Sequence, residues 1–194
     1  SKTGKVRKMY NLKHYKPRDQ TPSSFLFNNI KKIVLPNKPI LDIACGYGRN
    51  GGFLAYKDCR VVFIDNDIDC LKYIQTGKDL SIYGNVKTEN IRVLYKNLNL
   101  GKLPFPNDSV GGIIDIHYYN PLLIREMIRV LDVGGFFCFE SISARGQNIF
   151  ELPDYNFIKN ELNNFEIISY FERKVMPDEF CKSVIKIFTI KQHD

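Results

Sequence analysis

The sequence predicts an α/β fold, built on a single doubly wound sheet of seven mostly parallel strands that ends in an antiparallel C-terminal strand pair. Short apolar runs alternate with helical segments from residue 39 to residue 141. That alternation is typical of βαβ units and of a parallel sheet buried on both faces. Two later apolar runs, 165–171 and 183–191, have no helix between them, which favours an antiparallel pair. The chain has 194 residues, the size of one ordinary domain.

Each element follows from a local pattern. A first helix is expected over residues 21–34, where Thr21 or Ser23 can cap it and apolar residues recur at helical spacing. Buried strands are expected at 39–44, 60–65, 91–96, 110–117 and 136–141. Helices are expected at 49–57, 67–75, 120–131 and near 155–162.

The helix over residues 120–131 has the clearest pattern. Pro121 suits its first turn, and Gly134 with Gly135 is expected to end it. Its expected apolar face consists of Leu122, Leu123, Met127, Ile128 and Leu131.

Charge divides the chain into two parts. Residues 1–18 contain seven basic residues and no acidic one, and the net charge of the whole chain is +7. We therefore expect a basic N-terminal arm over residues 1–20 and one neutral domain over residues 21–194. Such an arm can make weak contacts with nucleic acid or an acidic surface, or it can be a solvated tail.

The loop after the first expected strand, within ILDIACGYGRNGG at residues 40–52, carries the strongest chemical signal. Gly46 and Gly48 allow a sharp turn and a close approach to a ligand, at the strand ends where open α/β sheets bind ligands. Together with Gly51 they also satisfy the dinucleotide pattern GxGxxG, and Asp65 stands where a ribose-binding acid belongs. Asp42 favours another ligand, because a carboxylate repels a pyrophosphate and suits an ammonium group.

Four ordered motifs resemble those of the class I, Rossmann-like S-adenosylmethionine-dependent methyltransferases. They are ILDIACGYGRNGGFLA at 40–55, VVFIDNDIDCL at 61–71, the segment 93–119, and MIRVLDVGGFFCFESIS at 127–143. The form of the first motif is most similar to small bacterial-type methyltransferases such as the tellurite-resistance group. The resemblance implies that the cofactor is S-adenosyl-L-methionine and that the chain is an enzyme.

The resemblance also implies roles for single residues around the cofactor. Those expected to line its methionine part are Asp42, Ala44, Gly46 and Gly48. Those expected at its nucleoside part are Asp65 on the ribose, Asn66 beside the adenine, and Asn97 and Leu98 flanking the adenine ring. The family often has Asp where Asn97 stands, and an Asn side chain still offers a carbonyl oxygen.

The end of the fourth strand is expected to face the acceptor. His117 has an ordinary pKa near ~6.5 and suits a general base, while Tyr118 could orient a substrate or contact the methyl group. The alternative for both is a structural role in hydrogen bonding and packing. Asp115 is expected to line the cofactor or to support the site.

The methyl acceptor is not fixed by sequence. We expect a small molecule, because the neutral domain contains no segment suited to docking a large substrate. The alternatives are RNA or protein recruited by the basic arm, a non-catalytic module that only binds the cofactor, and a nicotinamide-dependent oxidoreductase. Five cysteines without a CxxC pair and three scattered histidines predict no metal site and a cytoplasmic protein, and no apolar run is long enough for a membrane helix.

Overall fold

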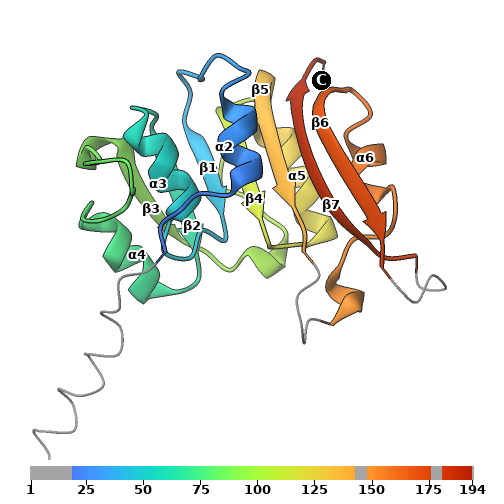
Figure 1. Cartoon of the computed structure of the whole chain (residues 1–194), viewed down its shortest axis with the longest axis horizontal. Helices are drawn as coiled ribbons and strands as arrows, with labels where there is room; N and C mark the ends of the chain where they lie inside the picture. Colours follow the sequence, from blue (N-terminus) through green and yellow to red (C-terminus); the bar gives the residue numbers. More distant parts are fainter. Residues whose placement is uncertain (1–18, 143–147, 176–180, 194) are drawn as a thin grey trace, which may run out of the picture.

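The computed structural model describes residues 19–142, 148–175 and 181–193, and these residues form a seven-stranded sheet. Figure 1 shows its strands lying side by side. The strand order is β3-β2-β1-β4-β5-β7-β6. The strands are β1 (Ile40–Ile43), β2 (Val61–Asp65), β3 (Ile91–Tyr95), β4 (Val110–Ile116), β5 (Leu131–Glu140), β6 (Phe165–Lys174) and β7 (Ser183–Lys191). The first five pair in parallel, and β7 pairs antiparallel with both β5 and β6. The predicted fold class is confirmed.

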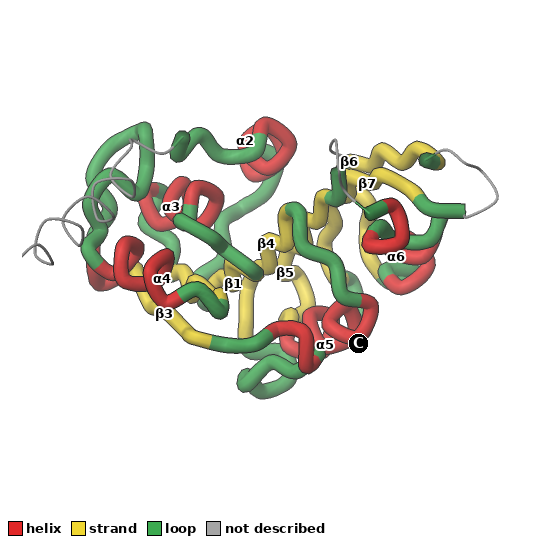
Figure 2. Tube along the Cα trace, turned by 90° about the horizontal axis from the view of Figure 1, so that it is seen from below, coloured by secondary structure: helices red, strands yellow, loops and turns green. Residues whose placement is uncertain are grey.

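Helices cover both faces of the sheet (Figure 2). One face carries α2 (Ser24–Ile30), α3 (Arg49–Tyr56) and α4 (Ile68–Gln75), and the other carries α5 (Pro121–Val130) and α6 (Phe157–Glu161). Single-turn 3₁₀ helices are η2 (Thr88–Asn90), η3 (Leu98–Leu100) and η4 (Ile149–Glu151). Because strands β1 to β5 share one direction, their carboxyl ends meet along one edge, where the loops 44–48, 117–120 and 141–142 begin.

The first helix is shorter than the sequence predicts. Ser23 caps it as expected, but α2 ends at Ile30 instead of continuing to Val34. Val34 is 94% exposed, so it takes no part in an apolar helix face. The chain turns away because Pro36 and Pro39 follow and because Pro36 packs against Gly111 at the start of β4.

The junction of α5 and β5 also differs from the prediction. The helix ends at Val130 and the strand begins at once with Leu131, five residues before the expected start at Phe136. Gly134, with a φ of 81°, therefore lies inside the strand instead of ending the helix. The expected apolar face was wrong at Leu122, which is 67% exposed, whereas Ile124 is fully buried.

In the part of the chain that the structure describes, no helix has the length and apolar character needed to cross a membrane. Residues 1–18, which carry most of the expected basic arm, lie outside the described residues. Gln20, which the sequence places in the arm, is buried and packs with the folded domain.

Candidate functional site at the carboxyl edge of the sheet

The loop between β1 and α3 is held from below by Asp42. Its Oδ2 accepts a hydrogen bond of 2.8 Å from the backbone N–H of Gly51 in the first turn of α3. Gly51 allows this approach, because a Cβ there would lie 2.6 Å from the same carboxylate oxygen and 2.4 Å from the ring of Phe63. Two glycines weaken α3 as an isolated helix, but they let it lie close against the sheet.

Burial dominates the electrostatics of Asp42. The side chain is 3% exposed, and this burial raises its pKa to about 7 although the Gly51 N–H and the nearby Arg49 oppose the shift. A cation placed beside this carboxyl would favour its charged form. Asp42 therefore suits the predicted contact with an ammonium group.

Asp65 at the end of β2 ties the same loop to the second strand. Its Oδ2 accepts from the Gly46 N–H at 2.8 Å and its Oδ1 from the Asp67 N–H at 2.9 Å. Each oxygen retains a further lone pair for a ligand hydroxyl. Asn66 lies next to it, exposed at the mouth of the site. A Cβ built on Gly46 would meet no atom within 4 Å, so open space lies over this part of the loop.

Asn97 and Leu98 reach the same edge through the pairing of β2 with β3. The N–H of Lys96 donates to the Asp65 carbonyl at 2.9 Å, which brings the start of η3 beside Asp65. Asn97 caps η3 by accepting from Asn99 N–H at 3.1 Å and is exposed, whereas the Leu98 side chain is buried in the core.

Ala44 occupies a backbone conformation that favours glycine, with a φ of 49°. We expect Ala44→Gly to raise the free energy of unfolding by about 0.5–1 kcal/mol, because a left-handed L-residue costs roughly 1–2 kcal/mol and the added freedom of the unfolded glycine returns part of that. Urea unfolding with an unchanged m-value measures it. The control Ala55→Gly, inside α3, should instead lose about 1 kcal/mol; equal losses would show that the strain at Ala44 is negligible.

Asp115, the second-to-last residue of β4, is fully buried. Burial raises its pKa well above the usual value, the nearby Asp42 raises it further, and only the backbone N–H of Tyr118 opposes the shift. Burial thus favours the neutral form of the Asp115 carboxyl.

The rim beyond Asp115 is formed by His117, Glu140 and Lys186. His117 has a left-handed φ of 72°, and its N–H donates to the Glu140 carbonyl at 2.8 Å, which fixes the turn out of β4. Partial burial lowers the pKa of the imidazole, and Arg49 and Lys186 lower it further while Glu140 opposes them. The Lys186 Nζ lies 3.6 Å from Glu140 Oε1.

Tyr118 points toward η3. Its hydroxyl donates to Asn99 Oδ1 at 2.7 Å, and its ring packs against the core beside α5. Burial raises the pKa of the phenol, so Tyr118 is a neutral hydroxyl near η3. The structure brings His117 and Glu140 together but turns the Tyr118 hydroxyl elsewhere.

The segment 19–23, which sequence reasoning did not place at the site, crosses the loop. Gln20 Nε2 donates to the Tyr47 carbonyl at 2.9 Å, and the Ser23 N–H donates to Asn50 Oδ1 at 2.8 Å. The Ser23 hydroxyl also donates to Glu140 Oε2. No local pattern signals these contacts, because the partners lie 27 to 117 residues apart.

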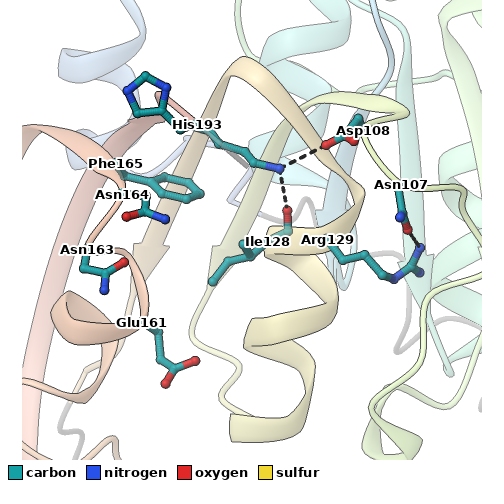
Figure 3. A pocket seen from close by; sticks show the side chains of 10 residues that line it. Asn107, Asp108, Ile128, Arg129, Glu161, Asn163, Asn164, Phe165 and His193 are labelled. Carbon is teal, nitrogen blue, oxygen red and sulfur yellow. Dashed lines mark hydrogen bonds and ion pairs between the residues drawn. The ribbon is translucent and has the colours of Figure 1, made fainter.

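A hollow of about 420 Å³ lies at the opposite edge of the sheet, between α5 and the ends of β6 and β7 (Figure 3). Its polar side chains pair with one another and with α5: Arg129 binds Asn107, and Lys191 binds Asp108. It is remote from the predicted site residues. Within the described ranges, no three or more His, Cys, Asp or Glu side chains gather as a metal site would require.

Residues 40–135, from β1 into β5, match the sequence profile of a family described as "Methyltransferase domain". No curated protein matches the chain. The strand order, with β7 antiparallel between β5 and β6, differs from the 3-2-1-4-5-6 order of the dinucleotide-binding fold.

Solved structures share the fold. A SAM-dependent methyltransferase from Methanosarcina mazei is 18% identical with a TM-score of 0.59, covering 86% of this chain and 98% of its own. TehB from Haemophilus influenzae is 17% identical with a TM-score of 0.62, over 86% of this chain and 61% of its own. A geranyl diphosphate C-methyltransferase from Streptomyces coelicolor A3(2) is 13% identical with a TM-score of 0.64, over 86% of this chain and 78% of its own. It was solved with Mg²⁺, geranyl diphosphate and S-adenosyl-L-homocysteine.

Proposed function

Because the chain belongs to the class I S-adenosyl-L-methionine-dependent methyltransferases, we propose that it transfers a methyl group to a small-molecule acceptor bound beside His117. The observation that supports this acceptor site is the rim at the ends of β4 and β5, where His117 lies with Glu140 and Lys186. The segment 19–23 crosses the neighbouring loop and contacts the same rim through the hydrogen bond of Ser23 with Glu140.

The residues at the carboxyl edge fit the donor. Open space over Gly46 provides room for a ligand, and the buried, unpartnered carboxyl of Asp115 favours a ligand that brings a positive charge close to it. Asp42 would hold the ammonium group and Asp65 the ribose hydroxyls, as the family resemblance implies. The donor supplies the reactive methyl carbon, and the protein contributes position and electrostatics.

His117 is proposed as the base for an acceptor that arrives protonated. A base acts in its deprotonated form, and the lowered pKa leaves the imidazole neutral at pH 7. The methylation rate should therefore rise with pH and level off before pH 7. We expect His117→Gln to lower that plateau by at least ~tenfold. The control is Lys182→Gln, which removes the ion pair of Lys182 with Asp154 just before β7 and should leave the plateau unchanged. A pH profile that His117→Gln leaves intact would exclude this role.

The acceptor class is tested with methyl-labelled S-adenosylmethionine and fractionated cell extract. We expect the label in the small-molecule fraction, together with stoichiometric S-adenosylhomocysteine. Calorimetry with S-adenosylmethionine, S-adenosylhomocysteine and NAD comes first; binding of NAD alone would overturn the donor assignment. Donor binding without label in any fraction would favour a non-catalytic module.

RNA is the second candidate acceptor, because the segment 19–23, which directly follows the basic residues 1–18, contacts the loop between β1 and α3. If RNA is the acceptor, the label appears in the RNA fraction, its incorporation falls steeply with salt, and deletion of residues 1–18 abolishes it. We also propose that the protein is cytoplasmic, whichever acceptor it uses. Its free cysteines suit a reducing compartment.

A further inference from the structure

One buried carboxyl at the donor site has no hydrogen-bond partner. Among the buried side-chain nitrogen and oxygen atoms of the described residues, only Oδ1 and Oδ2 of Asp115 lack one. The side chain is fully buried, and the Tyr118 N–H is near enough to favour its charged form but makes no hydrogen bond of normal geometry with it. A buried carboxylate without partners costs several kcal/mol, so this position calls for a reason.

The other carboxylates at the same edge do have partners. Backbone N–H groups or a hydroxyl donate to each of them: Asp42 from Gly51, Asp65 from Gly46 and Asp67, and Glu140 from Ser23. Those carboxylates shape the loop and the rim. Asp115 shapes neither, and its two buried oxygens receive no hydrogen bond from the described residues.

The position of Asp115 indicates which part of the donor it meets. Its register partners are Ile43 on β1 and Phe139 on β5, so it lies in the middle of the sheet edge. Asp42, in the strand beside it, lies under the glycine loop, and His117 lies two residues further on at the acceptor rim. The donor's reacting sulfur must lie between the group that binds its methionine part and the acceptor.

We propose that Asp115 is the counter-ion of the positively charged sulfur of the donor, and that this pairing makes the protein prefer S-adenosylmethionine over S-adenosylhomocysteine. The inference rests on the proposed function. Burial favours the protonated carboxyl in the protein alone, whereas the bound sulfonium favours the carboxylate, which then gives its proton to solvent. The donor's charge then offsets the desolvation of the carboxylate.

The pairing governs binding and release more than the chemical step. Methyl transfer converts the sulfonium to a neutral thioether, so the attraction to Asp115 disappears with the product. An interaction that weakens toward the transition state does not accelerate the reaction. It does favour exchange of the spent cofactor for a new donor.

Calorimetry on the full chain and on Asp115→Asn tests the proposal with three ligands. S-adenosylmethionine carries the sulfonium, sinefungin carries an ammonium group in its place, and S-adenosylhomocysteine is neutral there. We expect Asp115→Asn to weaken both cationic ligands at least tenfold and the neutral one less than twofold. Equal weakening of all three, or of none, would overturn the proposal.

Asp65→Asn is the matched control. All three ligands contain the ribose, so this variant should weaken them by one common factor. Wild-type protein that binds neither S-adenosylmethionine nor S-adenosylhomocysteine would overturn the proposed function itself. Wild-type protein that binds both with equal affinity would overturn only the role of Asp115.

Two further readouts separate a ligand contact from a folding defect. Asp115→Asn removes an ionisable group that has no partner, so its melting temperature without ligand should not fall; a fall of several degrees together with lost binding of all ligands would count against the proposal. Proton release is the second. The titratable groups that interact at this position are the carboxyls of Asp42 and Asp115 and the phenol of Tyr118. Asp42 meets the same ammonium group in S-adenosylmethionine and in S-adenosylhomocysteine. Only Asp115 should therefore make binding of S-adenosylmethionine release more protons than binding of S-adenosylhomocysteine.

Discussion

Lys191→Met is expected to lower the free energy of unfolding by about 3 kcal/mol, because it leaves buried acceptors without a donor. The ammonium group is buried at the end of β7 and donates to Asp108 Oδ1 at 3.0 Å, the Leu131 carbonyl at 2.8 Å and the Ile128 carbonyl at 3.3 Å. The bonds to Asp108 and to the Ile128 carbonyl are drawn as dashed lines in Figure 3. The group thus joins the last strand to the end of α5. Urea unfolding measures the loss.

Lys38→Met is the matched control for that substitution. Lys38 also binds near Asp108, donating to its carbonyl at 2.9 Å and forming an ion pair with Asp132, but its side chain is 49% exposed. Exposed ion pairs contribute about 0–1 kcal/mol, so this variant should lose less than 1 kcal/mol. Similar losses in the two variants would contradict the role given to burial at Lys191.

Gly52→Ala is expected to cost about 2 kcal/mol of stability, although alanine is the better helix former. A Cβ at Gly52 would lie 2.2 Å from the Leu80 carbonyl oxygen and 2.9 Å from its side chain. Overpacking of this kind costs about 3 kcal/mol, and the higher helix propensity of alanine returns about 1 kcal/mol. Because α3 follows the loop 44–48, where we propose that the donor binds, affinity for S-adenosylmethionine should fall as well.

Gly46→Ala separates steric clash from backbone strain. Gly46 has a φ of 54° and open space around its missing Cβ, so only the strain of about 1 kcal/mol applies. Its stability should lie between those of the wild type and Gly52→Ala, while its donor affinity falls because the new methyl group enters the open space. Gly46→Ala less stable than Gly52→Ala would contradict the packing of α3 described above.

The sequence predicts the sheet well because apolar runs buried on both faces are a local signal. The strands β1 to β5 and the pair β6 and β7 all fall on runs that periodicity identifies. The boundary between α5 and β5 is not local in this way. Leu131 continues the helical pattern, but it pairs with Val110 across the sheet, and that tertiary contact decides its conformation.

The residues of the site also divide into those with a local sequence signal and those set by tertiary contacts. Asp65 and the glycine loop are found from spacing, and the structure joins them through the Gly46 N–H. The contact of Ser23 with Glu140 spans 117 residues, and the lack of partners at Asp115 depends on every neighbouring side chain. Neither has a sequence pattern, since both arise only when the chain has folded.

The place of β7 constrains the order in which the sheet is completed. It follows β6 in the chain but lies between β5 and β6, so β6 has no strand to pair with until β7 has been synthesised. Newly made β5 and β6 both present open edges during translation, and such edges template unwanted pairing. The hairpin of β6 and β7 can form by itself, since its contacts are local, and then dock onto β5 as one unit. Folding of this half of the sheet therefore waits until β7 has been synthesised, whereas the loop between β1 and α3 needs only the earlier strands.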